Sequence, residues 1–529
     1  MASITTIPTE LLRHILAHVA DNLQSDIRAV RLVCKQFNEV AAPLRVRNWS
    51  DDRTSNQTLR HPTDIKMVSI DRFAVELLRY PELRSQVRSL KFVRLMSWEF
   101  YSYEKPLQQD GPRGRVFCQA SGEDLVMLAK AAEKELPHLS SLTNLCEQIR
   151  YFHHEAVAIL VIAWATNLES LSLAFGSFHF HMDDDILVSH FAKHVAQQFI
   201  SDGWANRHLP MEKLRHLEFL IGYNPARLDQ ELELGDNLKF LVPFLHLPRL
   251  KTLKCWAVRT ECEYRAWSNN IPEVHLVPFP NRTSSIESVE LVGPSFSTLG
   301  LGRFLQAFKT LKSLKVKVDG VYPQITRGPC NDGSLPRVLI EHASSLEELD
   351  LPLNRRSNRI DAEQQDMIDF EKHLRPNERL IETDELPECY KELTHVRKLG
   401  MPVFFRTRSV LNNRYTTTRL TPSHLPESIE HLTLYNTDEI VNEDGDPTPD
   451  DLRADPIDVL SILREAGEKG RLSQLKSICC TNSLWGYNNE AILAIAEERG
   501  VEWVWFDDTP ADTRELVDFG DDLYDEYFE

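Results

Sequence analysis

One short arrangement of apolar and polar positions recurs along most of the chain. An apolar residue is followed by two others, then by a second apolar residue, one more residue and a third apolar residue. A strand alternates its side chains between two faces, so this six-residue phrase predicts a short strand whose fourth and sixth residues point inward. The first residue is expected to pack beneath the preceding turn. The ten phrases are Val87–Phe92, Leu168–Leu173, Leu214–Phe219, Leu250–Cys255, Ile286–Leu291, Leu311–Val316, Leu346–Leu351, Val396–Met401, Ile429–Leu434 and Leu475–Cys480.

Repetition of the phrase predicts stacked units that share one core, because a single unit cannot bury its apolar face alone. Several phrases follow helix-like stretches, as in "FLQAFKTLKSLKV", so an α/β fold is expected. Roughly residues 85–506 resemble an irregular leucine-rich-repeat solenoid, with Asn354 completing the repeat pattern after Leu346–Leu351. Apolar triplets at this spacing also occur in other α/β proteins, so that alternative stays open.

The repeats are interrupted and bounded by other segments. Polar insertions are expected at 354–388 and 402–426, and insertions in repeat proteins map to loops on one face. "VEWVWF" (Val501–Phe506) predicts a last strand, and 507–529 form an acidic tail. The most apolar stretch, Ala156–Ala165, is about half the length of a membrane span and predicts a buried helix.

The N-terminal stretch Ile7–Leu44 has helical spacing instead. Pro8 suits a first helical turn, and Leu11, Ile15 and Val19 recur every four residues with Leu12 and Leu16 beside them. After "ADNLQSD", apolar residues continue at helical steps from Ile27 to Leu44. More of the circumference is apolar than one packing face needs, which predicts that part of this surface is covered by something else.

This stretch resembles an F-box. The matches to the family pattern are Ile7-Pro8, Glu10-Leu11-Leu12, Ile15-Leu16 and Val33-Cys34-Lys35 followed by Phe37. Ile7 replaces the usual Leu, Phe37 replaces the common Trp, and the first interhelix loop is somewhat long and polar. The resemblance covers about 40 residues and implies three short helices over residues 1–47, joined by a linker and helical connection (48–84) to the repeats.

The resemblance also implies partners. F-boxes dock onto a Skp-type adaptor, which joins a cullin scaffold carrying a ubiquitin-conjugating enzyme, and the chain would select a target protein through its repeats. The sequence does not separate adaptor-contacting residues from the core of the F-box itself. By family analogy, the adaptor-binding residues are Pro8, Leu11, Leu12, Ile15, Ile27, Leu32, Val33 and Phe37.

Composition narrows the classes of function. The formal net charge of −19 disfavours nucleic-acid binding, since an acidic chain repels phosphate backbones. No apolar run is long enough for a membrane span, and no secretory signal is recognisable at the N-terminus. The nine scattered cysteines include no CxxC pair, so reduced thiols and a cytoplasmic and/or nuclear location are expected.

Catalytic chemistry is sparse in the sequence. His179 and His181 alternate in "FHFHMDDD" beside Asp183–Asp185, and two histidines with a carboxylate are typical ligands of zinc or iron. A solvated loop explains the same residues without a metal, and no further ligand has convincing spacing. No recognised motif of a hydrolase, a phosphate-binding loop or a cysteine nucleophile is present. We therefore expect no cofactor and a non-catalytic chain.

The 402–426 insertion offers a different chemistry. It combines arginines and aromatic residues without an acidic residue, which suits capture of an acidic or phosphorylated target, although an ordinary loop folded onto the repeats explains it as well. The candidate target-binding residues are Phe404, Phe405, Arg406, Arg408, Arg414, Tyr415 and Arg419.

Three functions are compatible with these features. The leading interpretation is a substrate-recognition subunit of a Skp–cullin–F-box ubiquitin ligase. The alternatives are a leucine-rich-repeat interaction scaffold that acts without cullin, and an enzyme with a metal site around His179 and His181.

Overall fold

The structure is a computed structural model of the whole chain, and it forms two compact units. One unit comprises residues 1–223 with 240–253, and the other comprises 224–239 with 254–529. Several predicted features lie outside the described residues: Ile27, His179 and His181, Asn354, the insertion 354–388 and the tail 507–529. The described residues are 7–22, 30–50, 70–95, 120–175, 187–201, 209–221, 238–256, 258, 279, 281–292, 298–317, 335–352, 389–402, 404–409, 414–419, 421–435, 457–481 and 489–506.

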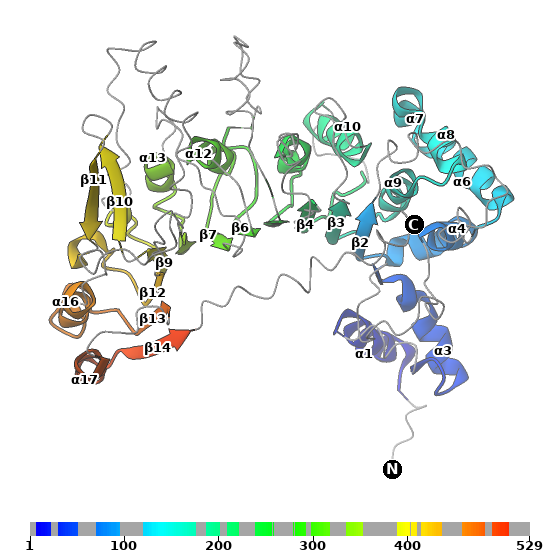
Figure 1. Cartoon of the computed structure of the whole chain (residues 1–529). Helices are drawn as coiled ribbons and strands as arrows, with labels where there is room; N and C mark the ends of the chain where they lie inside the picture. Colours follow the sequence, from blue (N-terminus) through cyan, green and yellow to red (C-terminus); the bar gives the residue numbers. More distant parts are fainter. Residues whose placement is uncertain are drawn as a thin grey trace, which may run out of the picture. The chain divides into compact units, whose positions relative to one another are not determined.

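Helices precede or separate most strands in both units (Figure 1). Helix α6 begins with a capping box, in which Ser121 and Asp124 exchange hydrogen bonds with each other's backbone N–H groups. The longer helices are α1 (Thr9–Asn22), α4 (Ile70–Arg79), α6 (Gly122–Glu135), α9 (His154–Trp164), α10 (Leu187–Ser201), α12 (Thr298–Gln306), α16 (Ile457–Glu465) and α17 (Asn489–Arg499). The shorter ones are α3 (Lys35–Ala41), α7 (Pro137–Thr143), α8 (Leu145–Arg150), α13 (Leu335–Glu341), and the 3₁₀ segments η2 (Ala42–Val46), η4 (Pro81–Gln86), η6 (Leu238–His246) and η7 (Pro422–His424).

The strands follow one another in chain order in a twelve-stranded sheet, which confirms the predicted α/β class. All the pairs of determined register in this sheet are parallel. Parallel neighbours need a crossover between them, which the helices and turns supply. Its strands are β1 (Asn48–Ser50), β2 (Ser89–Leu95), β3 (Ser170–Phe175), β4 (His216–Ile221), β5 (Thr252–Trp256), β6 (Ser288–Val292), β7 (Ser313–Lys317), β8 (Glu348–Asp350), β9 (Lys398–Pro402), β12 (His431–Tyr435), β13 (Ser477–Thr481) and β14 (Glu502–Phe506).

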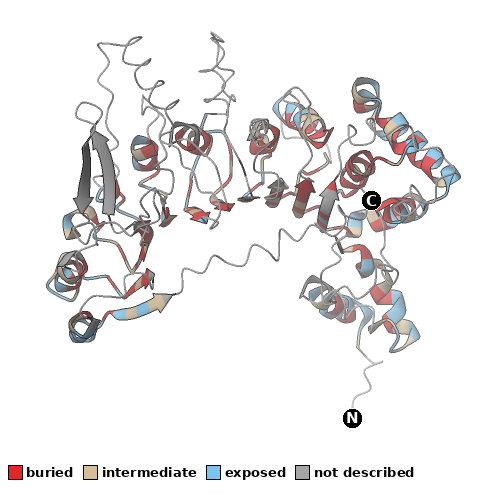
Figure 2. Ribbon diagram, viewed as in Figure 1, coloured by how far each residue is buried: buried red, intermediate tan, exposed pale blue. Residues whose placement is uncertain are grey.

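The recurring phrase accounts for the core of both units. Each of the ten phrases coincides with a strand of this sheet, and all thirty of its apolar positions are buried, none more than 5% exposed. Figure 2 shows this burial along the strands and on the helices. The prediction that the fourth and sixth positions point inward is therefore confirmed, and the first positions are buried as well. The apolar stretch Ala156–Ala165 was predicted to form a buried helix. Helix α9 confirms this, since Ala156 to Ile162 are all fully buried.

A repeated backbone hydrogen bond connects neighbouring strands at the start of nine of the ten phrases. The N–H groups of the second and third positions both donate to the carbonyl of the second position on the preceding strand. Glu169 and Ser170, for example, donate to the carbonyl of Arg88 at 2.8 and 3.0 Å. The carbonyl of the second position is the acceptor in every pair of neighbouring strands for which these hydrogen bonds are determined, so each strand starts level with its neighbour.

The sheet begins earlier than the ten phrases indicate. Strand β1 lies within the segment expected to be a linker, and its register pairs Trp49 with Leu90 of β2. Trp49 also stacks on Phe73 of α4, with ring centroids 4.8 Å apart. The sequence signal was weak here because "VRNWSD" has apolar residues at only two of the three phrase positions.

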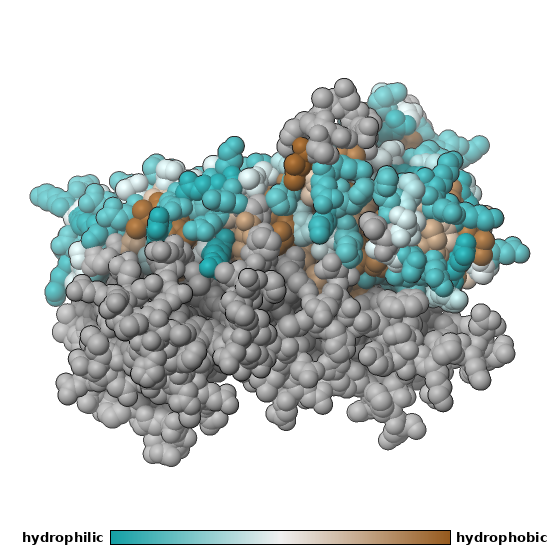
Figure 3. Space-filling view, turned by 90° about the horizontal axis from the view of Figure 1, so that it is seen from above, coloured by the Kyte–Doolittle hydropathy of each residue, from teal (hydrophilic) through white to brown (hydrophobic). Residues whose placement is uncertain are grey.

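Apolar residues are scattered over the outer surface. On the face shown in Figure 3, the described residues are mainly hydrophilic, with small, separate hydrophobic spots. Single exposed apolar residues are normal in folded proteins.

A buried carboxyl group links two helices of the first unit and predicts a pH effect. Glu155 of α9 accepts a hydrogen bond from the backbone N–H of Val188, in the first turn of α10, at 3.0 Å. Burial raises the pKa of Glu155 to about 8, although backbone N–H donors oppose the shift. The folded chain thus holds a proton that the unfolded chain loses above the usual carboxyl pKa, so rising pH lowers stability up to about 8.

We therefore expect Glu155→Gln to gain stability relative to the parent as pH rises from about 5 to about 8, because glutamine keeps the acceptor and does not titrate. Neighbouring His153 acts in the opposite sense. Burial lowers its pKa to about 4, so its contribution is lost as pH falls below the usual histidine range. Because both proteins contain His153, the difference in melting temperature isolates Glu155. A difference that stays constant over this pH range would contradict the assignment.

Candidate functional site

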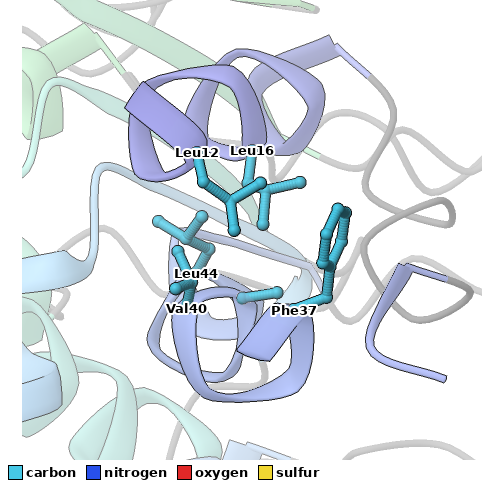
Figure 4. Packing of buried hydrophobic residues seen from close by; sticks show 6 residues of the cluster. Leu12, Leu16, Phe37, Val40 and Leu44 are labelled. Atoms are coloured by element: carbon cyan, nitrogen blue, oxygen red, sulfur yellow. The ribbon is translucent and has the colours of Figure 1, made fainter. Parts of the chain in front are cut away.

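The N-terminal helical segment, residues 7–46, contains a small core of its own. Leu12 and Leu16 of α1 point toward Phe37 and Val40 of α3 and toward Leu44 of η2 (Figure 4). Ala41 completes this group of buried residues, and Ile7, Ala17, Val19, Val30 and Cys34 pack against it as partly buried residues. The segment thus holds its helices together through its own apolar side chains.

The local sequence explains where these helices begin. The carbonyl of Pro8 accepts the N–H of Leu12 at 2.9 Å, so the first helical turn starts at the proline as predicted. Apolar residues recur at helical steps from Ile27 to Leu44, and within the described residues a turn at 31–33 separates this stretch from α3. Helix α3 follows Cys34, which has an extended backbone (φ −162°, ψ 170°). Because an extended residue cannot continue a helix, α3 begins as a separate helix after Cys34.

Four large apolar side chains of the predicted adaptor-binding set lie outside this core. Leu11 is 53% exposed, Ile15 45%, Leu32 87% and Val33 62%. Leu11 and Ile15 are four residues apart and therefore share one face of α1, whereas Leu32 and Val33 lie in the turn before α3. We call Leu11, Ile15, Leu32 and Val33 the exposed apolar set. Pro8 is exposed as well.

Two members of the predicted set have a different place. Leu12 is 1% exposed and Phe37 is 7% exposed, and both belong to the core of the segment. Since these side chains are already covered by Leu16, Val40 and Leu44, we assign them to folding of the segment rather than to its surface. Leu11 and Leu12 are adjacent apolar residues, so only the helix packing distinguishes them.

The segment is joined to the sheet without a flexible connection. Its last element, η2, ends at Val46, and β1 starts at Asn48. An ion pair between Arg45 of η2 and Glu76 of α4 adds a side-chain link. The segment is thus part of the first unit.

The predicted target-binding insertion contains a two-stranded antiparallel sheet. Strands β10 (Phe404–Ser409) and β11 (Arg414–Arg419) pair with each other and not with the twelve-stranded sheet. Opposed positions of an antiparallel pair lie on one face, so the alternate positions Phe404, Arg406 and Arg408 share a face with their partners Arg419, Thr417 and Tyr415. The positions Phe405 and Arg414 fall on the other face. The register therefore places five of the seven candidate target-binding positions on one face of the β10–β11 pair.

A row of charged residues was not anticipated from the sequence. The second position of each phrase is charged in every case, and the equivalent positions of β1 and β14 are charged too. We call these residues the second-position row: Arg47, Arg88, Glu169, Arg215, Lys251, Glu287, Lys312, Glu347, Arg397, Glu430, Lys476 and Glu502. Alignment of the ten phrases alone would have revealed this signal.

Metal and thiol chemistry have little support among the described residues. They contain no group of three or more histidine, cysteine, aspartate or glutamate side chains placed to hold a metal ion. His179 and His181 are outside this part of the chain, so the metal hypothesis stays a prediction. Burial raises the pKa of the Cys255 and Cys480 thiols well above neutrality, so neither is a thiolate nucleophile at pH 7.

Comparison with known proteins adds no further assignment. No family model matches the chain, and no curated protein is similar to it. Within the described segments, helices that combine the length and apolarity needed to cross a membrane are absent.

Proposed function

We propose that the chain is a substrate-recognition subunit of a Skp–cullin–F-box ubiquitin ligase. The observation that carries the proposal is the N-terminal segment, which has a small core of its own and still exposes four large apolar side chains, three of them (Leu11, Ile15 and Val33) at positions that match the F-box pattern. These residues would be buried by a Skp-type adaptor. The repeats would then hold the target protein.

The free energy for adaptor binding would come from burial of the exposed apolar set, which is exposed in the free chain. Burial of one such side chain contributes about 1.5–3 kcal/mol. Leu32 is the most exposed of the four, and it lies within the same segment as the predicted Val33-Cys34-Lys35 match. A site of this kind suits a partner with a complementary apolar groove, which is how F-boxes bind their adaptors.

The fold of the remaining chain supports the receptor part of the proposal. Strands in chain order, ten phrases and thirty buried phrase positions are the features expected of an irregular leucine-rich-repeat array. Such arrays present extended surfaces for protein partners. Their ligands depend on surface residues and not on the fold itself.

Affinity purification of the full chain tests the proposal. We expect a Skp-type adaptor and a cullin to co-purify with it, and proteasome inhibition to increase recovery of a third, target protein. Stable recovery of other proteins without adaptor or cullin would instead support a scaffold that acts independently of cullin.

The register of the β10–β11 pair gives a sharper prediction for target capture. Alanine at Arg406, Arg408 and Arg419 removes three arginines from one face, and we expect at least about fivefold less target in the purified complex. The matched control replaces Arg414, which occupies the opposite face, and should keep at least about half of the capture. Quantitative mass spectrometry measures both. Equal losses in the two variants, or no loss in the triple variant, would exclude this face as the capture surface.

A further inference from the structure

Strand β14 is the last strand of the twelve-stranded sheet (Figure 1). It pairs with β13 on one side, and no described strand pairs with its other side, which we call the outer edge of β14. Its start follows the pattern of the strands before it: Val501 is buried, and the N–H of Glu502 donates to the carbonyl of Lys476 at 2.8 Å. The outer edge therefore has the geometry that the other strands present to their next neighbour.

The fourth position of β14 lacks the cover that this position has in the other strands. In the ten phrases the fourth residue is at most 2% exposed, and Trp49, its equivalent in β1, is 5% exposed. Val504 is 36% exposed. In a stacked array each unit covers the apolar face of its neighbour, and a terminal unit has a neighbour on one side only. The exposure of Val504 thus indicates a place for one more apolar strand.

The charges of the second-position row indicate what such a strand would carry. In the second unit their signs alternate from strand to strand, in the order Glu287, Lys312, Glu347, Arg397, Glu430, Lys476 and Glu502. Lys312 pairs with Glu287 at 2.8 Å, and Lys476 pairs with Glu430 at 2.5 Å. Opposite charges on adjacent strands stabilise their pairing. The position that follows Glu502 therefore favours a lysine or an arginine.

We propose that the outer edge of β14 binds an extended segment of a partner protein as an additional parallel strand. In this mode of recognition, main-chain hydrogen bonds supply affinity and side-chain positions supply specificity. The segment has an apolar first residue, a lysine or arginine second, and apolar fourth and sixth residues. Its second and third N–H groups donate to the carbonyl of Glu502, as those of Lys476 and Ser477 donate to the carbonyl of Glu430 at 2.7 and 3.2 Å.

Other occupants suit this edge less well. In a parallel pairing, β14 of a second copy would place Glu502 beside Glu502, and like charges on adjacent strands are destabilising. The tail 507–529 is acidic, so it complements Glu502 less well than a basic segment does. The inference also stands apart from adaptor binding, because it uses none of the exposed apolar set. Failure to bind an adaptor would leave it intact.

The test uses the full chain and the fluorescent peptide TLKSLKVK, which has the sequence of residues 310–317. In the chain this phrase pairs with β6, and the N–H groups of Lys312 and Ser313 donate to the carbonyl of Glu287 at 2.7 and 3.1 Å. Fluorescence anisotropy should show saturable binding. Methylation of the same two backbone nitrogens in the peptide should raise the Kd about tenfold, because it removes both donors. Attraction of a basic peptide to an acidic chain would not depend on these N–H groups.

A charge exchange tests the place of the peptide. Glu502→Lys should raise the Kd of TLKSLKVK about fivefold, whereas the peptide TLESLKVK should bind this variant more tightly than the parent. The matched control is Glu497→Lys, the same change at an exposed position of α17, which should alter both Kd values less than about twofold. Melting temperatures establish that both variants fold, and the N-methylated peptide tests the parent chain without any substitution.

The proposal is overturned if TLKSLKVK does not bind the parent chain, if N-methylation leaves the Kd unchanged, or if the Glu502 and Glu497 variants respond alike. Binding that appears only after removal of residues 507–529 would assign the edge to the chain's own tail instead. Self-association of the parent in sedimentation, lost in Glu502→Lys and unaffected by the peptide, would assign it to a second copy. Either result also overturns the proposal.

Discussion

Serine at Leu11, Ile15 and Leu32 is expected to weaken adaptor binding at least about a hundredfold without unfolding the chain. Side chains that anchor protein interfaces typically cost about 2 kcal/mol or more each when truncated. All three side chains are exposed in the free chain, so their loss leaves the core around Leu12 untouched. Adaptor pull-down and a parallel thermal melt measure the two parts of this expectation.

A matched control comes from apolar residues exposed elsewhere. Ile340 of α13 and Leu493 of α17 are exposed to a similar degree as Ile15. Serine at both positions should leave adaptor capture within about twofold of the parent, because surface changes away from an interface have small effects. Undiminished capture by the Leu11, Ile15 and Leu32 variant would exclude the exposed apolar set as the adaptor site.

A core variant separates surface loss from unfolding. Alanine at Leu12 with alanine at Phe37 should also abolish capture, but through loss of the N-terminal core, since each buried truncation costs about 2–5 kcal/mol. Hydrogen exchange in α1 and α3 should then rise, whereas the exposed-set variant should keep parental protection.

The second large effect is expected at Gly470, where alanine should destabilise the second unit by about 3 kcal/mol or more. A Cβ at this position would lie 1.9 Å from the backbone carbonyl oxygen of Glu465. That oxygen accepts the N–H of Leu472 at 2.9 Å, in the turn that connects α16 to β13. The turn must open to admit the methyl group, and the buried side chains of Ala466 and Leu472 would be displaced with it.

Gly122 provides the control for this substitution. It is the first residue of α6, and a Cβ there meets no atom within 4 Å. Gly122→Ala should therefore be neutral or stabilise the chain by up to about 1 kcal/mol, because alanine loses less backbone entropy on folding. Chemical denaturation compares the two variants. A cost for Gly470→Ala within about 0.5 kcal/mol of that for Gly122→Ala would mean that the turn adapts freely.

The sequence alone determined most of the sheet. Side-chain alternation in a strand is a local property, so the recurring phrase was sufficient to predict ten strands and the burial of residues such as Leu171 and Leu349. The uniform apolar composition of Ala156–Ala165 likewise predicted a buried helix, and the structure confirms it as part of α9.

Only the tertiary structure decided which apolar residues remain outside the core. Leu11 and Leu12 are the same residue type and adjacent in the sequence. Their exposed fractions differ because α3 and η2 cover one side of α1 only. The place of strand β1 was decided by the tertiary structure as well. Trp49 stacks on Phe73, which is distant in sequence, and the spacing of residues within β1 does not predict this contact. The adjacency of Arg215 and Lys251 also required the strands to be aligned. The sequence thus determined local alternation, whereas packing between distant segments decided exposure and the neighbours of each charge.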